Sequence, residues 1–385
     1  MAMHETAPRR RPRDRKATIV AASAELFADR GYAAVRVDDI GDRVGISGPA
    51  VYRHFPSKEA VLGAVLLDVV ITFDDAASSA HDLRAMVSSS MHAALDRPAA
   101  LGTYLRERPS LRSGAAPALE ARERQLRRRW RDAIRAAAVG VTPADADQRA
   151  LATLATIDVV ARRRATMPRP AFDDLMTEAL VAVLTTPVDR GRSSGPRRSG
   201  WSPPESRAEA ILDAALALFR ARGYHGVGVD DIGEAAGISG PTVYAYYGSK
   251  AEILDEAFDR AGARVTAGVH EALARASSAE EALAGLIASY VDVARDQVDL
   301  IVVTTREGAT IPDEDRGRRS RQRRRVRDAW VGVLRELRPE LSEGAARTLV
   351  AGVFPLVLAL VTADAPPGRA ATLAAIFLGV PSASR

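Results

Sequence analysis

Two short clusters in the sequence carry side chains that suit hydrogen bonding to a polyanion. In the first, Tyr52, Arg53 and His54 come shortly before Lys58. A guanidinium can donate two hydrogen bonds to one guanine edge, and a lysine adds positive charge beside it. The second cluster repeats this order as Tyr244, Ala245, Tyr246 and Lys250. These residue types predict contacts with DNA.

The sequence offers little for catalysis. It has no cysteine, its 6 histidines are scattered, and no nucleophile motif or phosphate-cradling loop is present. His54 has no histidine or carboxylate three or four residues away, so a groove contact is favoured over a metal ligand. The carboxylate pairs at 38–39 and 230–231 lie where a helix is predicted to begin, and there they favour the helix dipole. We predict no enzyme activity, no cofactor and no metal site.

Both clusters belong to an internal repeat. Residues 31–62 and 223–254 align without a gap and are identical at more than half of their positions. A looser match downstream pairs residues 127–133 with 323–329 and sets Trp130 opposite Val326. The pattern therefore predicts that a whole structural unit is duplicated.

Local signals place the clusters on a helix-turn-helix. Asp14 is predicted to cap a first helix that ends at Gly31, a glycine suited to a left-handed C-cap. A short helix over residues 37–44 and a glycine turn follow. Ser47 is predicted to cap a third helix over residues 48–55, whose small first residues allow close approach to DNA. The equivalent caps in the second copy are Ser206, Gly223 and Ser239.

Alanine and leucine abound and aromatic residues make up only 5% of the chain, which favours helices over sheet. We predict an all-α protein of two tandem units, each with an N-terminal three-helix DNA-binding domain followed by a helical ligand-binding and dimerisation bundle. The predicted domains are a basic flexible arm (1–12), a first helix-turn-helix domain (13–62), a first bundle (63–187), a flexible linker rich in Pro, Gly, Ser and Arg (188–204), a second helix-turn-helix domain (205–254) and a second bundle (255–385).

At these residues the sequence resembles the TetR/AcrR family of bacterial regulators. The family pattern joins a glycine, an apolar residue and a serine to an aromatic-rich recognition helix and a serine-lysine pair. It appears here at residues 45–47, 52–55 and 57–58, and again at 237–239, 244–247 and 249–250. The resemblance implies an all-helical fold, dimerisation through the last two helices, and release from operator DNA when a small molecule binds. Most members act as repressors.

The resemblance also implies roles for individual residues. Phosphate contacts are implied for Tyr52, Lys58, Tyr244 and Lys250. Base or groove contacts are implied for Ser47, Gly48, Ala50, Arg53 and His54, and in the second copy for Ser239, Gly240, Thr242, Ala245 and Tyr246. Family members usually carry Thr or Ser at the N-cap of the second helix, where this sequence has Arg36 and Gly228. Arg36 can still donate hydrogen bonds to a phosphate, whereas Gly228 has no side chain to do so.

Charge and hydropathy indicate the compartment. The net charge is +5, and arginines cluster at the N-terminus and near mid-chain, either as nucleic-acid contacts or as solvated tails. The first residues are polar and Arg-rich, so no signal peptide is predicted. The longest apolar run, residues 350–363, is too short to cross a bilayer. We expect a cytoplasmic protein without a membrane partner.

The arginine-rich segments 122–135 and 316–327 leave two interpretations open. One is a solvated face paired with Glu120, Glu123 and Asp132; the other is a basic rim for an anionic effector such as a coenzyme A thioester. The apolar segments 151–161 and 349–361 are predicted to be packing helices of the dimer type. An effector pocket is expected between 83–105 and 151–161, or between 282–303 and 349–361.

These observations predict a transcription regulator released from its operator by a small apolar or acyl-CoA-like effector. The alternative is a binding module of this type that has lost DNA affinity and acts by pairing with another regulator. The two units are expected to pair as a pseudo-dimer within one chain, since some twenty linker residues reach about 66 Å. The rival arrangement is a homodimer of tandem chains. Because the outward residues of the two recognition helices differ, the operator is not expected to be a true palindrome.

Overall fold

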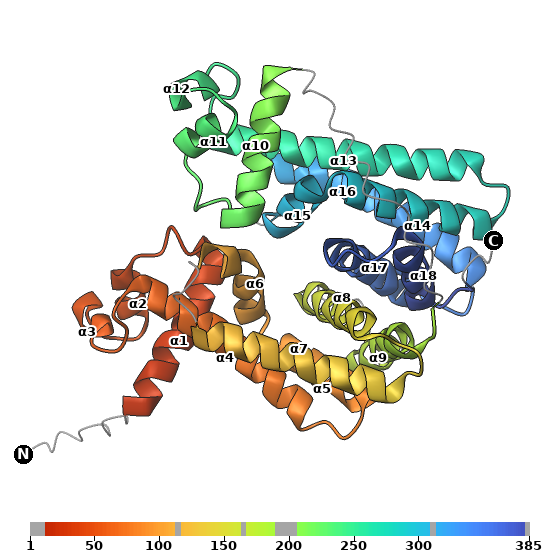
Figure 1. Ribbon diagram of the computed structural model, residues 1–385, viewed down its shortest axis with the longest axis horizontal. Coiled ribbons are helices and arrows are strands. Elements are labelled where there is room, and N and C mark those ends of the chain that lie inside the picture. Colours follow the sequence, from red (N-terminus) through yellow and green to blue (C-terminus); the bar gives the residue numbers. More distant parts are fainter. Residues whose placement is uncertain (1–11, 112–116, 163–166, 189–205, 309–312, 382–385) are drawn as a thin grey trace, which may run out of the picture. The chain divides into compact units, whose positions relative to one another are not determined.

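The computed structural model describes residues 12–111, 117–162, 167–188, 206–308 and 313–381. Within these ranges the chain is helical and contains no strand, which confirms the predicted all-α class (Figure 1). The predicted arm at 1–12 and linker at 188–204 lie outside the described residues, except for Pro12 and Val188. The first repeat contains α1 (Pro12–Arg30), α2 (Val37–Arg43), α3 (Gly48–Tyr52), α4 (Lys58–Ser78), α5 (Leu83–Asp96), α6 (Pro98–Glu107), a short 3₁₀ helix (Arg108–Ser110), α7 (Pro117–Ala137), α8 (Pro143–Arg162) and α9 (Arg169–Thr185).

The second repeat follows the same order of helices. It contains α10 (Arg207–Arg222), α11 (Val229–Ala235), α12 (Gly240–Val243), α13 (Lys250–Arg275), α14 (Ala279–Asp296), α15 (Val298–Arg306), α16 (Asp313–Leu337), α17 (Glu343–Thr362) and α18 (Pro367–Leu378). The chain forms two compact units, one of residues 1–72 and 99–123 and the other of residues 73–98 and 124–385. The second unit thus includes the helices of the second repeat together with the end of α4, α5, most of α7, α8 and α9 of the first.

The first helix of each repeat builds the core of the DNA-binding domain. Ile19 and Phe27 of α1 are fully buried, and Gly31 ends the segment at a φ of 78° with its N–H bonded to the Phe27 carbonyl at 3.0 Å. Because α1 begins at Pro12, Asp14 lies inside the helix and the predicted cap at Asp14 is wrong. In the second repeat Ser206 does cap α10, since its Oγ accepts from the Glu209 N–H at 3.2 Å.

Glycines fix the turn between the second and third helices. Gly45 adopts a φ of 70° and Gly237 a φ of 69°, a conformation that other residues rarely adopt. One turn earlier, a Cβ on Gly41 would lie 2.6 Å from the Ile46 carbonyl oxygen, and one on Gly233 would lie 2.8 Å from the Gly240 nitrogen. The close approach of the helix to the turn therefore requires glycine at this position in both repeats.

The helical bundles of the two repeats differ by added turns. α13 has 26 residues where α4 has 21, and α14 has 18 where α5 has 14, so each is longer by about one turn. Trp130 in α7 and Trp330 in α16 then occupy equivalent places, since both are fully buried and neither indole nitrogen has a hydrogen-bond partner among the described residues. The sequence match that set Trp130 opposite Val326 is wrong by one helical turn.

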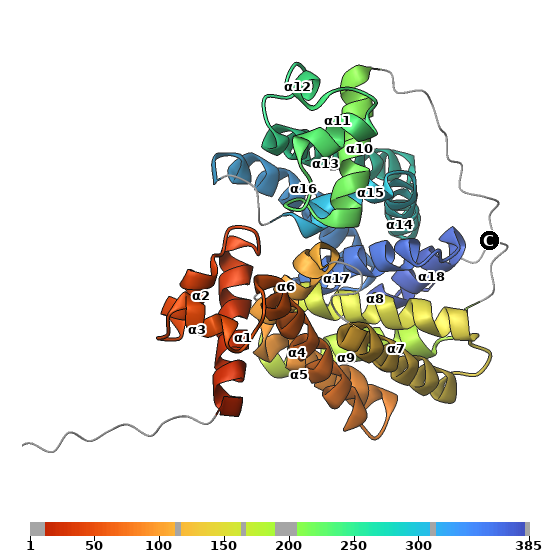
Figure 2. The same cartoon turned by 60° about the vertical axis from the view of Figure 1, so that its left-hand side comes forward.

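The last helices of the two repeats pack on each other within the second unit. α17 lies along α8, with α9 and α18 beside them (Figures 1 and 2). The approach is close, because a Cβ on Gly352 would lie 3.2 Å from the Thr156 Cγ2 atom. The segments 151–161 and 349–361 are therefore packing helices, as their apolar character predicts.

Helix α17 is longer and more apolar than the sequence run at 350–363 suggests. Over 18 residues it reaches a mean hydropathy of 1.9, and by length and composition alone it could cross a membrane. Within the described ranges it is the one helix of this kind, and 67% of that stretch is buried inside the protein. Such burial is typical of a core helix.

Candidate nucleic-acid interface

The recognition helix of each repeat is short and displays tyrosine to solvent. α3 ends at Tyr52, so the helix predicted over residues 48–55 is shorter than expected. Val51 and Phe55 face the core at 1% and 8% exposure, whereas Tyr52 is 52% exposed. In the second repeat Val243 and Tyr247 are buried in the same way. Two tyrosines there face outward, Tyr244 at 55% and Tyr246 at 45% exposure.

The remaining outward positions differ in chemistry between the repeats. The Arg53 side chain is exposed and makes no hydrogen bond or ion pair with other described residues, and His54 next to it is half-exposed. At the place of Arg53 the second repeat carries the exposed Ala245. The first repeat thus presents a free guanidinium where the second presents only a methyl group.

The serine before each recognition helix is not a side-chain cap. Ser47 has the extended backbone of an N-cap (φ −73°, ψ 151°), but its hydroxyl makes no capping bond, and Ser239 is the same (φ −76°, ψ 150°). The predicted capping role of these hydroxyls is therefore wrong. The Ser239 hydroxyl instead lies 2.7 Å from the Thr242 hydroxyl on the exposed surface. Because one hydroxyl donates to the other in this bond, the pair keeps one O–H hydrogen that can be donated to an oxygen of a ligand.

The first residue of each recognition helix packs inward. Gly48 and Gly240 are buried, and a Cβ at either would collide with a carboxylate oxygen, that of Asp38 or Asp230. These glycines therefore serve the packing of the second helix on the third. Ala50 is half-buried and Thr242 exposed, so both lie closer to a surface ligand.

The lysine after each recognition helix is folded onto its own domain. Lys58 Nζ donates to the Ala33 carbonyl at 3.3 Å and lies 4.4 Å from the centre of the Tyr32 ring. Lys250 Nζ donates to two carbonyls, of Tyr224 and Val227, each at 2.9 Å. Burial lowers the pKa of both lysines. The negative charge of Glu107 near Lys58, and of Glu307 near Lys250, offsets part of this lowering. Any phosphate contact from these ammonium groups must use their remaining donor capacity.

The N-cap of the second helix holds its backbone in the same way in both repeats. The Arg36 N–H donates to Asp39 Oδ2 at 2.6 Å, and the Gly228 N–H donates to Asp231 Oδ2 at 2.7 Å. The Arg36 side chain is 82% exposed and touches Asp38 only at 4.0 Å. The Arg36 guanidinium is therefore accessible to a ligand, and its phosphate contact stays a prediction, whereas Gly228 offers no side chain.

One pair of residues that sequence reasoning missed joins the DNA-binding domain to the helices behind it. The Tyr32 N–H donates to Glu107 Oε1 at 3.0 Å, and Arg106 Nη2 donates to the Ala28 carbonyl at 3.0 Å. Glu107 is 1% exposed, so the pair ties the end of α6 to the end of α1 through buried polar groups.

The second repeat carries the same pair. Arg306 Nη1 donates to the Arg220 carbonyl at 3.2 Å, and Glu307 is 2% exposed. Burial raises the pKa of Tyr224, and the Glu307 carboxylate raises it further. The only signal in the sequence is an Arg-Glu pair at 106–107 and 306–307, too common a dipeptide to be recognised alone.

The arginine-rich helices are partly explained by ion pairs. Glu123 accepts from Arg108 at 2.7 and 3.1 Å, Arg129 donates to Asp74 at 2.9 Å, and Asp132 lies 3.8 Å from Arg131. In α16, Arg319 donates to Asp255 at 2.9 Å and to Asp259 at 3.1 Å. The paired interpretation therefore accounts for part of each helix, and the effector interpretation stays a prediction.

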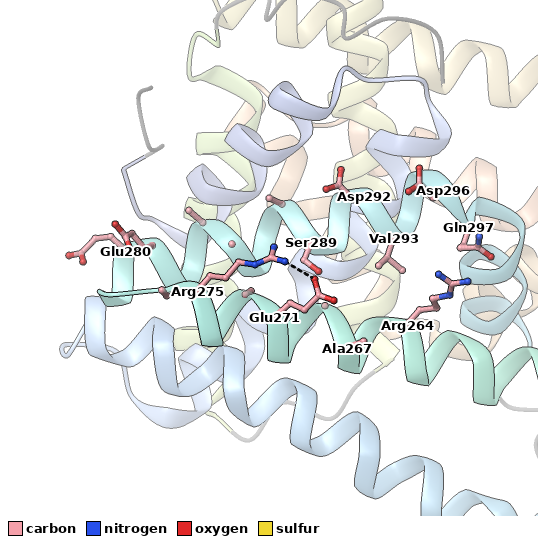
Figure 3. Close-up of a pocket in the computed structure, with 17 residues that line it drawn as sticks. Arg264, Ala267, Glu271, Arg275, Glu280, Ser289, Asp292, Val293, Asp296 and Gln297 are labelled. Carbon is pink, nitrogen blue, oxygen red and sulfur yellow. Dashed lines mark hydrogen bonds and ion pairs between the residues drawn. The ribbon is translucent and has the colours of Figure 1, made fainter. Parts of the chain in front are cut away.

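A groove of about 1070 Å³ runs between α13 and α14 (Figure 3). Its floor is made of alanine and glycine, and its walls carry five carboxylates and two arginines. Figure 3 shows Arg275 paired with Glu271 along one wall, at 3.5 Å. The groove does not reach α17, so it is not the pocket predicted between 282–303 and 349–361.

Comparison with known proteins agrees with this architecture. The profile of "Bacterial regulatory proteins, tetR family" matches residues 19–65 and 211–257, the DNA-binding region of each repeat. The chain therefore carries the N-terminal domain of this family twice.

The activator FasR of Mycolicibacterium smegmatis is 48% identical over 58 residues, which are 15% of this chain and 26% of FasR. The repressor KstR2 of the same species is 30% identical over 132 residues, 32% of this chain and 64% of KstR2. A TetR-family regulator from Bordetella parapertussis has a TM-score of 0.43 at 20% identity, over 46% of this chain and 96% of its own. The chain thus spans about a quarter of FasR and less than two thirds of KstR2.

Proposed function

We propose that this protein is a sequence-specific DNA-binding transcription regulator with two unlike DNA-binding heads in one chain. The observation that carries the proposal is the pair of recognition helices α3 and α12. Each helix is fixed by buried residues on one side. Exposed tyrosine lies at or just after its C-terminal end, as Tyr52 in the first repeat and Tyr244 and Tyr246 in the second, and the first repeat adds the unpaired Arg53 guanidinium directly after α3. Exposed aromatic and basic groups on a helix of this kind suit the major groove.

The DNA-contacting residues of the proposal fall into two groups. Tyr52, Arg36 and Tyr244 lie at the edges and suit phosphates, whereas Arg53, His54 and Tyr246 lie where base edges are read. Lys58 and Lys250 act mainly by holding the loop after the first helix. The hydroxyls of Ser47, Ser239 and Thr242 add hydrogen-bond donors to the surface that faces DNA.

We further propose that the protein is a cytoplasmic repressor released by a small apolar or acyl-CoA-like effector. The named relatives include both an activator and a repressor, so the sign of regulation needs its own measurement. Support for an effector comes from Trp330, which makes an edge-to-face contact with Phe354 at 5.2 Å between ring centres and whose buried nitrogen has no partner among the described residues. A ligand oxygen beside this nitrogen would satisfy it.

One chain is proposed to be the binding unit. The packing of α8 on α17 joins the repeats as the dimer helices of two separate subunits would be joined, so a second chain is not needed. The rival homodimer of tandem chains would carry four heads. A single tandem chain that presents two heads fits an operator of two adjacent half-sites.

A mobility-shift titration of the purified chain with DNA from its own promoter tests the proposal. We expect a discrete complex that resists competitor DNA and weakens steeply with salt. Arg53→Ala and Tyr52→Phe should weaken the complex, whereas Arg43→Ala, which removes a surface ion pair with Glu25 of α1, should not. Equal binding to all sequences, or no binding, would favour the alternative of a module that pairs with another regulator.

A further inference from the structure

An ion pair crosses from one repeat to the other in the buried contact between the last helices. Asp145 lies near the start of α8 in the first repeat, and Arg369 lies in the first turn of α18 in the second. The Arg369 guanidinium bonds to the Asp145 carboxylate, and the two residues are 8% and 9% exposed. Arg369 also donates to Gln148 Oε1 at 3.4 Å, and Gln148 Nε2 donates to the Ala363 carbonyl at 2.9 Å. The contact is therefore polar and buried, and every bond joins unlike repeats.

The helix caps show which residues correspond in the two repeats. Thr142 Oγ1 accepts from the Asp145 N–H at 3.2 Å, and Ser342 Oγ accepts from the Ala345 N–H at 3.2 Å. Asp145 of the first repeat thus corresponds to Ala345 of the second.

The N-caps of the final helices give the second correspondence. Pro168 before α9 has φ −56° and ψ 141°, and Pro366 before α18 has φ −56° and ψ 142°. Counting three residues from each cap, Arg369 corresponds to Ala171. Neither repeat therefore carries both members of the ion pair.

We propose that Asp145 and Arg369 restrict the packing of these helices to one first repeat against one second repeat. If two first repeats paired, each Asp145 would face an alanine, and if two second repeats paired, each Arg369 would face an alanine. Paired second repeats would bury each Arg369 without a partner, which is among the most costly changes in a protein interior. Paired first repeats would cost each Asp145 its direct bond to Arg369 and leave it only the attraction of the buried Arg149 in its own repeat. The charge pair thus disfavours assembly of like repeats from different chains and favours the closed single chain. This inference rests on the proposed single-chain binding unit.

Moving the arginine from one repeat to the other tests this directly in the full chain. The double variant Ala171→Arg with Arg369→Ala removes the partner of Asp145 within the chain and supplies one between two first repeats. We expect light scattering at micromolar concentration to give a one-chain mass for the wild type and a two-chain mass for this variant. Ala171→Arg alone is the matched control, because the original pair stays intact and residue 171 is exposed. It should keep the one-chain mass.

Charge reversal separates a true pair from two residues that are merely structural. Asp145→Arg and Arg369→Asp should each lower the melting temperature by about 5 °C or more, and the double reversal should recover most of the loss. If the two losses of melting temperature simply add in the double reversal, the proposed pair is overturned. It is also overturned if the double variant Ala171→Arg with Arg369→Ala keeps a one-chain mass and is as stable as Arg369→Ala alone. A two-chain mass for the wild type would overturn the single-chain unit instead, and the reversal cycle would still decide the pair. If a reversal variant fails to fold, Arg369→Lys replaces it, since that variant keeps the charge and should lose less than Arg369→Ala.

Discussion

Arg53 gives the sharpest prediction about how the two heads read DNA. It is exposed and unpaired among the described residues, so Arg53→Ala should change the stability of the free protein by no more than about 0.5 kcal/mol. On DNA, a bidentate contact of arginine with guanine discriminates by about 1–3 kcal/mol. Because about 1.4 kcal/mol is a tenfold change, Arg53→Ala should weaken binding to the preferred operator by about 5- to 140-fold.

The assay is a titration against two operators that differ only at the guanine read by the first head, identified beforehand by selection from random DNA. The wild type should prefer the guanine operator, and Arg53→Ala should bind both equally. The converse variant Ala245→Arg should gain a guanine preference in the other half-site, because the exposed Ala245 holds the place of Arg53. If Arg53→Ala weakens both operators by the same factor and flattens the salt dependence, Arg53 contacts a phosphate and the reasoning is refuted. A selected operator with perfect two-fold symmetry would also refute it.

Four further predictions concern the residues that support the heads and the bundle behind the second one. Lys250→Ala should lower the melting temperature more than Lys58→Ala, since Lys250 donates to two carbonyls and Lys58 to one; equal losses would contradict this. If Lys58 also binds a phosphate, its removal should reduce the slope of log affinity against log salt by about 0.9, and an unchanged slope would confine it to a structural role. Glu107→Ala removes the acceptor of a backbone N–H and should destabilise the first repeat by about 1–3 kcal/mol in urea unfolding, whereas Glu107→Gln keeps an acceptor and should lose less. Trp330→Phe should abolish the rise in melting temperature caused by an acyl-CoA or fatty-acid effector, with Trp130→Phe as the matched variant in the other repeat; an unchanged rise would place the effector elsewhere.

Much of the DNA-binding region could be predicted from the sequence because short-range signals determine it. A left-handed glycine, a buried apolar face and a tight turn are local features, and their repetition within one chain made them unmistakable. What the sequence could not predict is which of several nearby hydrogen-bond partners a polar side chain takes. A serine before a helix predicts a side-chain cap, yet in Ser47 and Ser239 the hydroxyl stays on the surface. For the lysine beside each recognition helix the structure adds carbonyl partners that the sequence did not reveal, and its phosphate contact stays a prediction.

The helical bundles were harder to predict because their patterns do not fix the register. A segment with many arginines matches itself at several offsets, and adding one turn returns every side chain to nearly the same face. The match of Trp130 with Val326 was an error of this kind. The buried pair Arg106–Glu107 was missed for a different reason: its partners lie near residue 30, and no local pattern reveals a contact over such a separation.

The tandem arrangement links the two main inferences. When identical subunits pair, both heads carry the same residues, and the operator can be bound in either orientation. Here the cross-repeat pair of Asp145 and Arg369 favours one first repeat against one second repeat, so each assembled molecule carries one head with Arg53 and one with Ala245. Covalent linkage keeps the two repeats at a high effective concentration and lets the heads diverge without losing their partner. A protein built this way must bind an unsymmetrical operator in a single orientation, which gives the bound complex a defined direction relative to the promoter.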